Sequence, residues 1–240
     1  MISRMEIITS DVFWLNVSRL LILLFTGVIG WMTYRSSLLL KSIVIETNIL
    51  LSPAESVARL VFVGICFFLA WLSGVSPEQL GLVIDNPWRI VGWGFGLGIV
   101  IQLLINLITT QTIKIFGREI YSPWLIQNIL PRRSGEWPLI ALAFIPPVLM
   151  EELLFRTLLI GVFRDIIALP LLVLVTSIVF GLMHQPQGKL GMMITGVINV
   201  IFCVLFIWSG QLLLTFIVHY TVNCLQVVFA FHQRTWLKNY

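Results

Sequence analysis

The sequence has few charged residues. Asp, Glu, Lys and Arg make up 11% of its 240 residues, whereas soluble domains contain about 25%. Hydrophobic residues make up 58%, so the composition excludes a soluble globular domain and predicts a membrane protein with several spans. The formal net charge of +4 is small, and a basic excess is expected in the cytoplasmic loops of a membrane protein. The expected partner is therefore the lipid bilayer, and the charge gives no reason to expect a nucleic acid.

Cysteine is scarce as well. Cys66, Cys203 and Cys224 lie in apolar segments and show neither a CxxC pair nor a Cys/His ligand spacing. Their pattern implies neither a disulfide framework nor a structural zinc site, and they are expected to be packing residues. Alternating strand patterns and hairpin signals are missing too, which leaves an all-α protein as the prediction. The first apolar run, 12–34, is too long for a signal-peptide core and is expected to be retained as a span.

Seven apolar stretches are long enough to cross a bilayer, at about 20 residues per crossing. We expect spans at roughly 12–34, 54–74, 89–113, 137–163, 166–185, 190–208 and 211–232. The segment 38–51 is short and carries Lys41 and Glu46, so an interfacial helix is expected there; if it crossed, there would be eight spans. The predicted fold is a polytopic transmembrane helical bundle with a polar intramembrane cavity.

Glycine is concentrated in the third expected span, at Gly92, Gly94, Gly96 and Gly98. Glycines four residues apart let two helix backbones approach closely. A phosphate-binding loop would need a preceding strand, and none is present. These glycines therefore predict close helix packing.

Lys and Arg are unevenly distributed among the loops. The N-terminus and the loops after spans two, four and six hold Arg4, Arg89 and Arg164. The other loops and the C-terminus hold nine, which are Arg35, Lys41, Lys114, Arg118, Arg132, Arg133, Lys189, Arg234 and Lys238. Because the basic excess marks the cytoplasmic side, we expect a cytoplasmic C-terminus and an N-terminus on the opposite side.

Three charged residues, Glu151, Glu152 and Arg156, lie inside the fourth expected span. A charge at the bilayer centre costs about 2.5–3.5 kcal/mol on insertion scales, so such residues are paired or functional. Glu152 and Arg156 are four apart and can pair on one helix face, whereas Glu151 lies about 100° round the helix. One carboxylate is thus predicted to be structural and the other free for chemistry; a cluster that only joins helices is the alternative. Pro146-Pro147 predicts a helix break, with a new helix N-terminus close to Glu151.

Two of the three histidines lie inside expected spans. His184 follows Phe180 by four residues, and His219 precedes Asn223 by four, so each pair shares a helix face. Each of these polar groups would be costly if it faced lipid separately. We therefore expect them to meet the two glutamates in one water-filled cavity that opens to the cytoplasm.

Two chemistries fit this set of side chains. A carboxylate and an imidazole can bind and deprotonate a water, and a second His with an Asn can donate hydrogen bonds to an oxyanion. Together they would hydrolyse an amide bond. Histidine and glutamate are also zinc ligands, so the same set could hold a metal with a bound water. The HExxH motif is absent, and the spacing alone leaves both schemes open.

The motifs Glu-Glu-x-x-x-Arg at 151–156, Phe-x-x-x-His at 180–184 and His-x-x-x-Asn at 219–223 resemble, in this order, the CPBP family of intramembrane proteases. That family includes the CAAX prenyl proteases of the Ras-converting type and bacterial Abi and lysostaphin-resistance proteins. Each motif alone is weak, but three in order on separate hydrophobic spans are specific. The resemblance covers about 135–230, and the N-terminal half fits only as additional helices.

The resemblance implies an intramembrane endopeptidase with four catalytic residues. Glu151 and His184 would activate the water, and His219 and Asn223 would stabilise the oxyanion. The residues with a supporting role would be Glu152, Arg156 and Phe180. No cofactor is expected in this scheme; the alternative is zinc held by Glu151, His184 and His219.

The resemblance also implies a domain organisation and a partner. N-terminal transmembrane helices would occupy 1–134, the catalytic core 135–232 and a short cytoplasmic tail 233–240. The partner would be a peptide or protein substrate at the cell membrane, prenylated or bacteriocin-like. The rival interpretation is a non-proteolytic membrane scaffold or transporter that regulates a partner protein. A transporter is disfavoured because the two halves show no inverted repeat.

Overall fold

The computed structural model describes residues 4–40 and 47–237, and this part of the chain is helical without a strand. The longer helices are α1 (Arg4–Leu40), α2 (Pro53–Leu72), α3 (Pro87–Phe116), α8 (Gly188–Ser209) and α9 (Leu212–His232). The shorter ones are α4 (Trp124–Ile129), α5 (Glu136–Ala143), α6 (Ile145–Glu152), α7 (Leu169–Met183) and α10 (Arg234–Leu237). A π-helical segment, η3 (Leu153–Gly161), continues α6. Three 3-10 turns lie in the connections, η1 (Ile49–Leu51), η2 (Arg118–Ile120) and η4 (Gln185–Gln187). The all-α prediction is confirmed.

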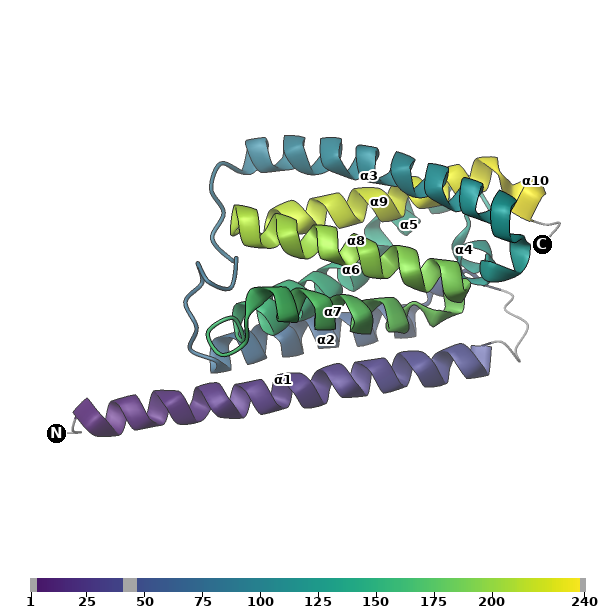
Figure 1. The fold of residues 1–240 in the computed structure, drawn as a ribbon. Coiled ribbons are helices and arrows are strands. Elements are labelled where there is room, and N and C mark those ends of the chain that lie inside the picture. Colours follow the sequence, from purple (N-terminus) through teal and green to yellow (C-terminus); the bar gives the residue numbers. More distant parts are fainter. Residues whose placement is uncertain (1–3, 41–46, 238–240) are drawn as a thin grey trace.

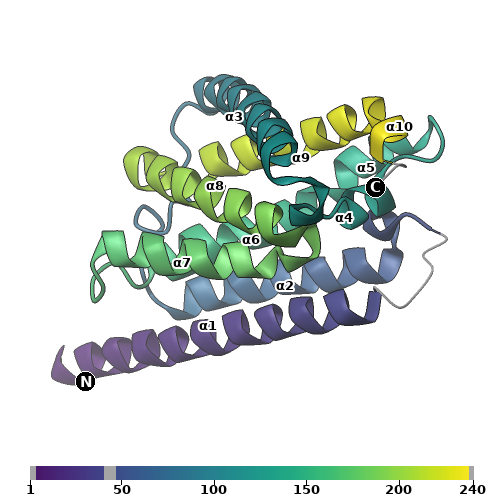
Figure 2. The same ribbon diagram turned by 45° about the vertical axis from the view of Figure 1, so that its right-hand side comes forward.

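The long helices run side by side as a bundle (Figure 1). α3 packs along α9, α7 packs along α8, and α2 packs against α6. α1 lies on the outside of the bundle next to α2, as a second view also shows (Figure 2). The beginning of α1 and the short helix α10 lie at opposite ends of the bundle (Figure 1).

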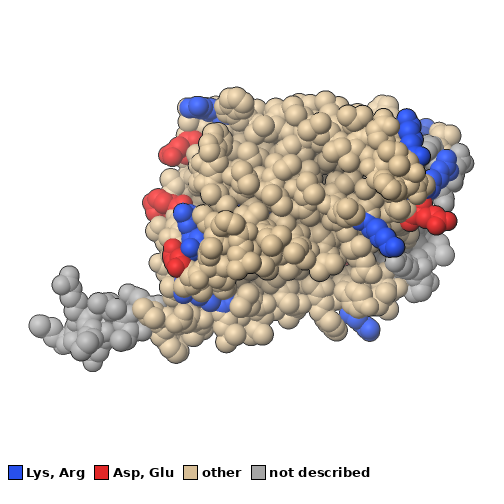
Figure 3. Space-filling model, in the orientation of Figure 1, with Lys and Arg blue, Asp and Glu red and all other residues tan. Residues whose placement is uncertain are grey.

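Within the described residues, six helical segments are long and apolar enough to cross a membrane. They are Val12–Leu39, Pro53–Leu72, Pro87–Phe116, Glu136–Gly161, Gln185–Ser209 and Leu212–His232. On the face shown in Figure 3, charged side chains gather toward the two ends of the bundle, and other residues form the middle. These features confirm a polytopic transmembrane bundle. The remaining expected span, 166–185, corresponds to α7, which is shorter than predicted at 15 residues.

The segment 38–51, expected to form an interfacial helix, lies partly outside the described residues, which omit 41–46. Its first three residues are the end of α1, and its last three form η1. Asn48 accepts a hydrogen bond from the backbone N–H of Leu50 and donates one to the carbonyl of Ile129, each at 3.0 Å. These bonds tie the beginning of α2 to the end of α4.

The predicted helix break before the glutamates is present. α5 ends at Ala143, α6 begins at Ile145, and the two prolines occupy the first turn of α6, where a backbone N–H is not needed. Glu151 is the next-to-last residue of α6. The expectation that the helix N-terminus lies close to Glu151 is therefore wrong, because six residues, more than one turn, separate them.

Two of the four glycines on α3 bring that helix against α9. A Cβ atom added at Gly94 or Gly98 would come within 2.6 Å of an α9 side chain, whereas Gly92 and Gly96 face open space. The prediction of close helix packing is confirmed for Gly94 and Gly98 and is wrong for Gly92 and Gly96. Farther along the two helices, Asn106 and the following turn of α3 face the C-terminal half of α9. There, residues of both helices line a cavity.

Candidate active site

Glu152 and Arg156 form a buried ion pair. Arg156 Nη1 lies 3.3 Å from Glu152 Oε1, and neither side chain has exposed surface. The pairing predicted from their spacing is confirmed, although Arg156 lies in the π-helical η3. The guanidinium also lies 5.7 Å from the ring centroid of Phe180 and 5.2 Å from that of Phe202, within the range of cation–π attraction. Phe180, expected to support the site, thus contacts the buried cation directly.

His219 lies between the two glutamates. Its Nδ1 donates a hydrogen bond to Glu152 Oε1 at 2.8 Å, and its Nε2 lies 3.6 Å from Glu151 Oε2. The contact joins α9 to α6 across 67 residues of sequence. The buried carboxylate fixes the orientation of the ring, and Nε2 faces the accessible carboxylate. Sequence reasoning expected His219 and Glu151 to meet in one cavity, but it missed the hydrogen bond from His219 to Glu152.

His184 directly follows the last residue of α7. Its Nδ1 lies 2.7 Å from the carbonyl oxygen of Phe180. Because a carbonyl only accepts hydrogen bonds, Nδ1 must carry the hydrogen, and Nε2 of the neutral ring is left as an acceptor. The imidazole also packs on the Phe180 ring, with 4.4 Å between the centroids. These two contacts hold His184 in one orientation.

Two neighbouring cavities meet at the predicted catalytic residues. The smaller cavity, of about 170 Å³, is lined by Glu151, His184, His219 and Asn223. The larger, of about 450 Å³, is lined by the last three but not by Glu151. The structure therefore brings together four side chains that come from α6, from the end of α7 and from α9.

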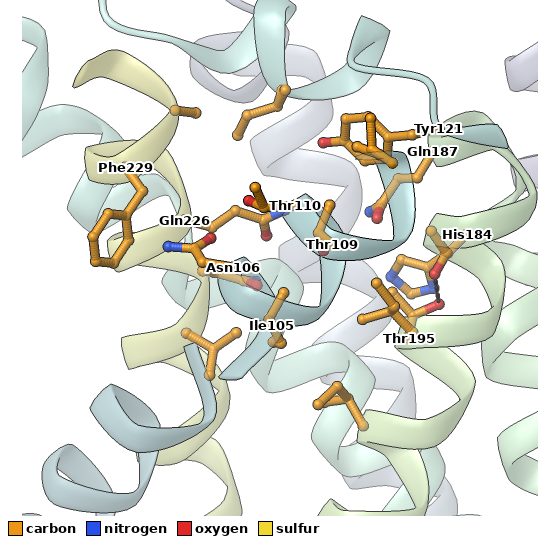
Figure 4. Close-up of a pocket in the computed structure, with 18 of the residues that line it drawn as sticks. Ile105, Asn106, Thr109, Thr110, Tyr121, His184, Gln187, Thr195, Gln226 and Phe229 are labelled. Atoms are coloured by element: carbon orange, nitrogen blue, oxygen red, sulfur yellow. Dashed lines mark hydrogen bonds between the residues drawn. The ribbon is translucent and has the colours of Figure 1, made fainter. Parts of the chain in front are cut away.

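The larger cavity lies between α3, α8 and α9 and has two kinds of wall. Its apolar wall includes Ile105, Ile194, Ile198 and Phe202. Its polar wall on α3 and α9 includes Asn106, Thr109, Thr110 and Gln226. Figure 4 shows Asn106, Thr110 and Gln226 on one side of the space and His184 and Gln187 on the other.

Sequence reasoning missed several lining residues. Tyr121 lines both cavities, although it lies between the third and the fourth expected span. Gln187 and Gln226 line both cavities as well. Gln226 follows Asn223 by three residues and shares its helix face, which is a signal that the sequence carries. No comparable local signal marks Tyr121.

A metal would need several of these side chains around one point. Among the residues that the structure describes, no three His, Cys, Asp or Glu side chains are grouped in this way. A catalytic zinc normally has three protein ligands. As they lie here, Glu151, His184 and His219 do not fit that requirement, and the chemistry below uses the side chains alone.

Comparisons with known proteins point to one family. The family model described as "Type II CAAX prenyl endopeptidase Rce1-like" matches residues 133–225, which contain all three motifs. The chain is 27% identical over 164 residues to "Membrane-embedded CAAX protease MroQ" of Staphylococcus aureus (strain USA300). That alignment spans 64% of this chain and 64% of the relative, which is less than two thirds of either. No solved structure matches the chain significantly. Residues 133–225 of the chain are therefore similar to the Rce1-like CAAX prenyl endopeptidases, and 164 residues of it are similar to a membrane-embedded CAAX protease.

Proposed function

We propose that the protein is an intramembrane endopeptidase that hydrolyses a peptide bond of a membrane-associated substrate with a water activated by Glu151 and His184. The observation that carries this proposal is the smaller cavity, where an accessible carboxylate, two imidazoles and an amide line the same space. The similarity of residues 133–225 to a family of endopeptidases supports it independently.

Glu151 is the proposed base. A quarter of its side chain, 25%, is exposed, whereas Glu152 is fully buried against Arg156 and His219. A water held between Glu151 and Nε2 of His184 would donate a hydrogen bond to each and direct a lone pair at the substrate carbonyl. As the oxygen–carbon bond forms, one proton of the water passes to Glu151.

His219 and Asn223 are the proposed oxyanion donors. When the carbonyl electron pair moves onto oxygen, the Nδ2–H of Asn223 and the Nε2–H of protonated His219 donate to the resulting anion. One such donor is worth about 2.7–4 kcal/mol in measured cases. Collapse of the tetrahedral intermediate breaks the carbon–nitrogen bond, and Glu151 returns its proton to the leaving amine. The base is then ready for another cycle.

The buried ion pair positions His219 in this scheme. Glu152 Oε1 accepts the Nδ1–H of His219, which fixes the plane of the ring and leaves Nε2 facing the cavity. The guanidinium of Arg156 always carries its charge, so it keeps the Glu152 carboxylate paired inside the protein. The second glutamate of the motif is therefore a positioning residue that touches no substrate.

The larger cavity is the proposed binding site for an extended peptide. The carboxamides of Asn106 and Gln226 can exchange hydrogen bonds with a peptide main chain whatever its sequence. The apolar wall, with Ile198 and Phe202, can take an aliphatic side chain or a lipid group. We propose a prenylated or bacteriocin-like peptide as the substrate class, because residues 133–225 match a family model of CAAX prenyl endopeptidases and the three motifs resemble those of the CPBP family.

The site is proposed to face the cytoplasm. Lys114 and Gln233, which line the larger cavity, lie near the ends of α3 and α9, at the end of the bundle that also holds α10 (Figure 1). The bias of Lys and Arg in the loops predicts that this end is cytoplasmic. A reporter fused after Tyr240 should give a cytoplasmic signal, and a signal from the opposite side would reverse the orientation.

Peptide-terminus profiling of membranes tests the proposed activity. Cells that express the wild type are expected to show new termini in membrane-associated proteins, and these termini should be absent with Glu151→Ala. The two proteins must be present in equal amounts. Identical profiles under that condition would contradict an endopeptidase and favour a non-proteolytic scaffold.

A further inference from the structure

Arg59 contributes a cation to the wall of the smaller cavity. It lies in the second turn of α2, in a helix that precedes the family-matched residues 133–225. Because α2 packs against α6, Arg59 and Glu151 line the same cavity. None of the three sequence motifs includes Arg59, and the hydrolytic scheme above assigns it no task.

The guanidinium of Arg59 is only partly satisfied. Its Nη2 lies 3.5 Å from Oε2 of Glu55, one turn earlier on the same helix, where the Glu55 side chain is 54% exposed. Its Nη1 is buried and has no hydrogen-bond partner within residues 4–40 and 47–237. A buried charged donor without an acceptor is destabilising, whereas an exposed pair one turn apart contributes little. Arg59 is therefore prepared to bind an anionic acceptor inside the cavity.

The size of the cavity limits where that acceptor lies in a substrate. The smaller cavity holds about 170 Å³, below the about 300–1,000 Å³ of typical ligand pockets. Only a short piece of peptide fits beside Arg59. The larger cavity, which shares His184, His219 and Asn223 with the smaller one, has room for the longer piece. An anion close to the scissile bond on the short side is supplied by the carboxyl terminus, whatever the side chains of the peptide.

We propose that Arg59 binds the terminal carboxylate of the substrate and thereby directs cleavage to a bond a few residues from the C-terminus. This inference rests on the endopeptidase activity proposed above and adds a specificity-determining residue to it. A guanidinium matches a carboxylate with two parallel hydrogen bonds, and a cavity poor in water strengthens the pair. Hydrolysis then releases a short C-terminal peptide, whose new amino group receives the proton held by Glu151.

Synthetic peptides with and without a terminal charge test the role of Arg59. A mixture of N-terminally labelled dodecapeptides, randomised with apolar residues, is made once with a free carboxyl terminus and once with a terminal amide. Full-length protein in lipid nanodiscs is incubated with each mixture, and mass spectrometry gives rates and cleavage positions. The wild type should cleave the acids about 10- to 100-fold faster than the amides, the range for a hydrogen bond to a charged group. Arg59→Gln should lower the acid rate to the amide rate, mainly through KM.

Glu55→Gln is the matched control, because it removes the partner of Nη2 but leaves the cation of Arg59 in place. It should keep the preference for acids, and Arg59→Lys should keep part of it. Equal cleavage of acids and amides by the wild type would overturn the role of Arg59, as would an equal loss for both in Arg59→Gln, while the endopeptidase would stand. If the wild type cleaves neither mixture faster than Glu151→Gln, the proposed activity itself is overturned.

Discussion

Glu151 and Glu152 are neighbours in sequence but lie in two regions of different character. Glu152 lies in the packed interior, without exposed surface, and contacts Arg156 and His219. Glu151 lies on the cavity side with 25% of its side chain exposed, and it approaches His219 at 3.6 Å. One step along the helix, about 100° round its axis, separates a permanently paired carboxylate from one that can meet water.

The comparison shows how a charge can be kept available inside a membrane protein. Buried charges are tolerated when they are paired and surrounded by favourable groups, as Arg156 is by Glu152 and two aromatic rings. Glu152 and Arg156 line neither cavity, yet Glu152 orients His219, which lines both. The orientation of the His219 ring in the cavities is therefore set by its hydrogen bond to the buried Glu152.

The largest expected effect is a loss of activity on the cavity side. Glu151→Gln should lower the rate of peptide cleavage by about 100- to 10,000-fold, because an amide cannot take the proton of the water. The unfolding midpoint in detergent should match the wild type, since Glu151 takes part in no short hydrogen bond to His219. An active Glu151→Gln protein would transfer the role of base to the other carboxylate.

On the packed side, the expected effect is a loss of stability. Glu152→Gln leaves Arg156 buried without its counter-charge and should lower the free energy of unfolding by about 3–5 kcal/mol. Chemical unfolding of the purified protein in detergent measures this difference.

A double variant controls for the loss of the glutamate itself. Glu152→Gln combined with Arg156→Met should be more stable than Glu152→Gln alone, because the uncompensated charge is removed as well. If Glu152→Gln were as stable as the wild type, the ion pair between Glu152 and Arg156 would not contribute to the stability of the packed interior.

Asn223→Ala sharpens the comparison within the cavity. Loss of one oxyanion donor should lower kcat by about 100- to 1,000-fold while KM changes little, because the hydrogen bond forms only in the transition state. Cys224→Ala, at the next residue and outside both cavities, is the matched control and should keep its activity. A raised KM with kcat intact would make Asn223 a binding residue.

Chelation should have the smallest effect. The ligand grouping that a catalytic zinc requires is not present among the described side chains, so activity should survive prolonged treatment with a chelator. Elemental analysis of active protein should give substoichiometric zinc. One tightly bound zinc per chain, lost with activity and restored on adding the metal back, would instead make ligands of Glu151, His184 and His219.

Features that depend on one helix at a time could be predicted from the sequence. The pair of Glu152 and Arg156 follows from four-residue spacing, and the break before α6 follows from two adjacent prolines. The long apolar runs placed the helices that cross the membrane. These predictions succeed because helix geometry alone decides them.

Features that depend on how the helices pack could not be predicted. The hydrogen bond from His219 on α9 to Glu152, and the position of Arg59 on α2 in the wall of the smaller cavity, were not foreseen. Helices that are apolar on every side carry little information about which face points inward. For the same reason, nothing in the apolar run Leu153–Gly161 distinguishes the π-helix seen there from an ordinary α-helix.

The shortness of α7 has a consequence for the lipid around it. Its 15 residues rise about 22 Å, less than the about 30 Å thickness of a hydrocarbon core. Leu174 and Ile178 are more than half exposed, so lipid chains lie against this helix. A bilayer next to a short helix becomes thinner. Because His184 directly follows α7, we expect such thinning to bring headgroups and their water closer to the depth of this histidine.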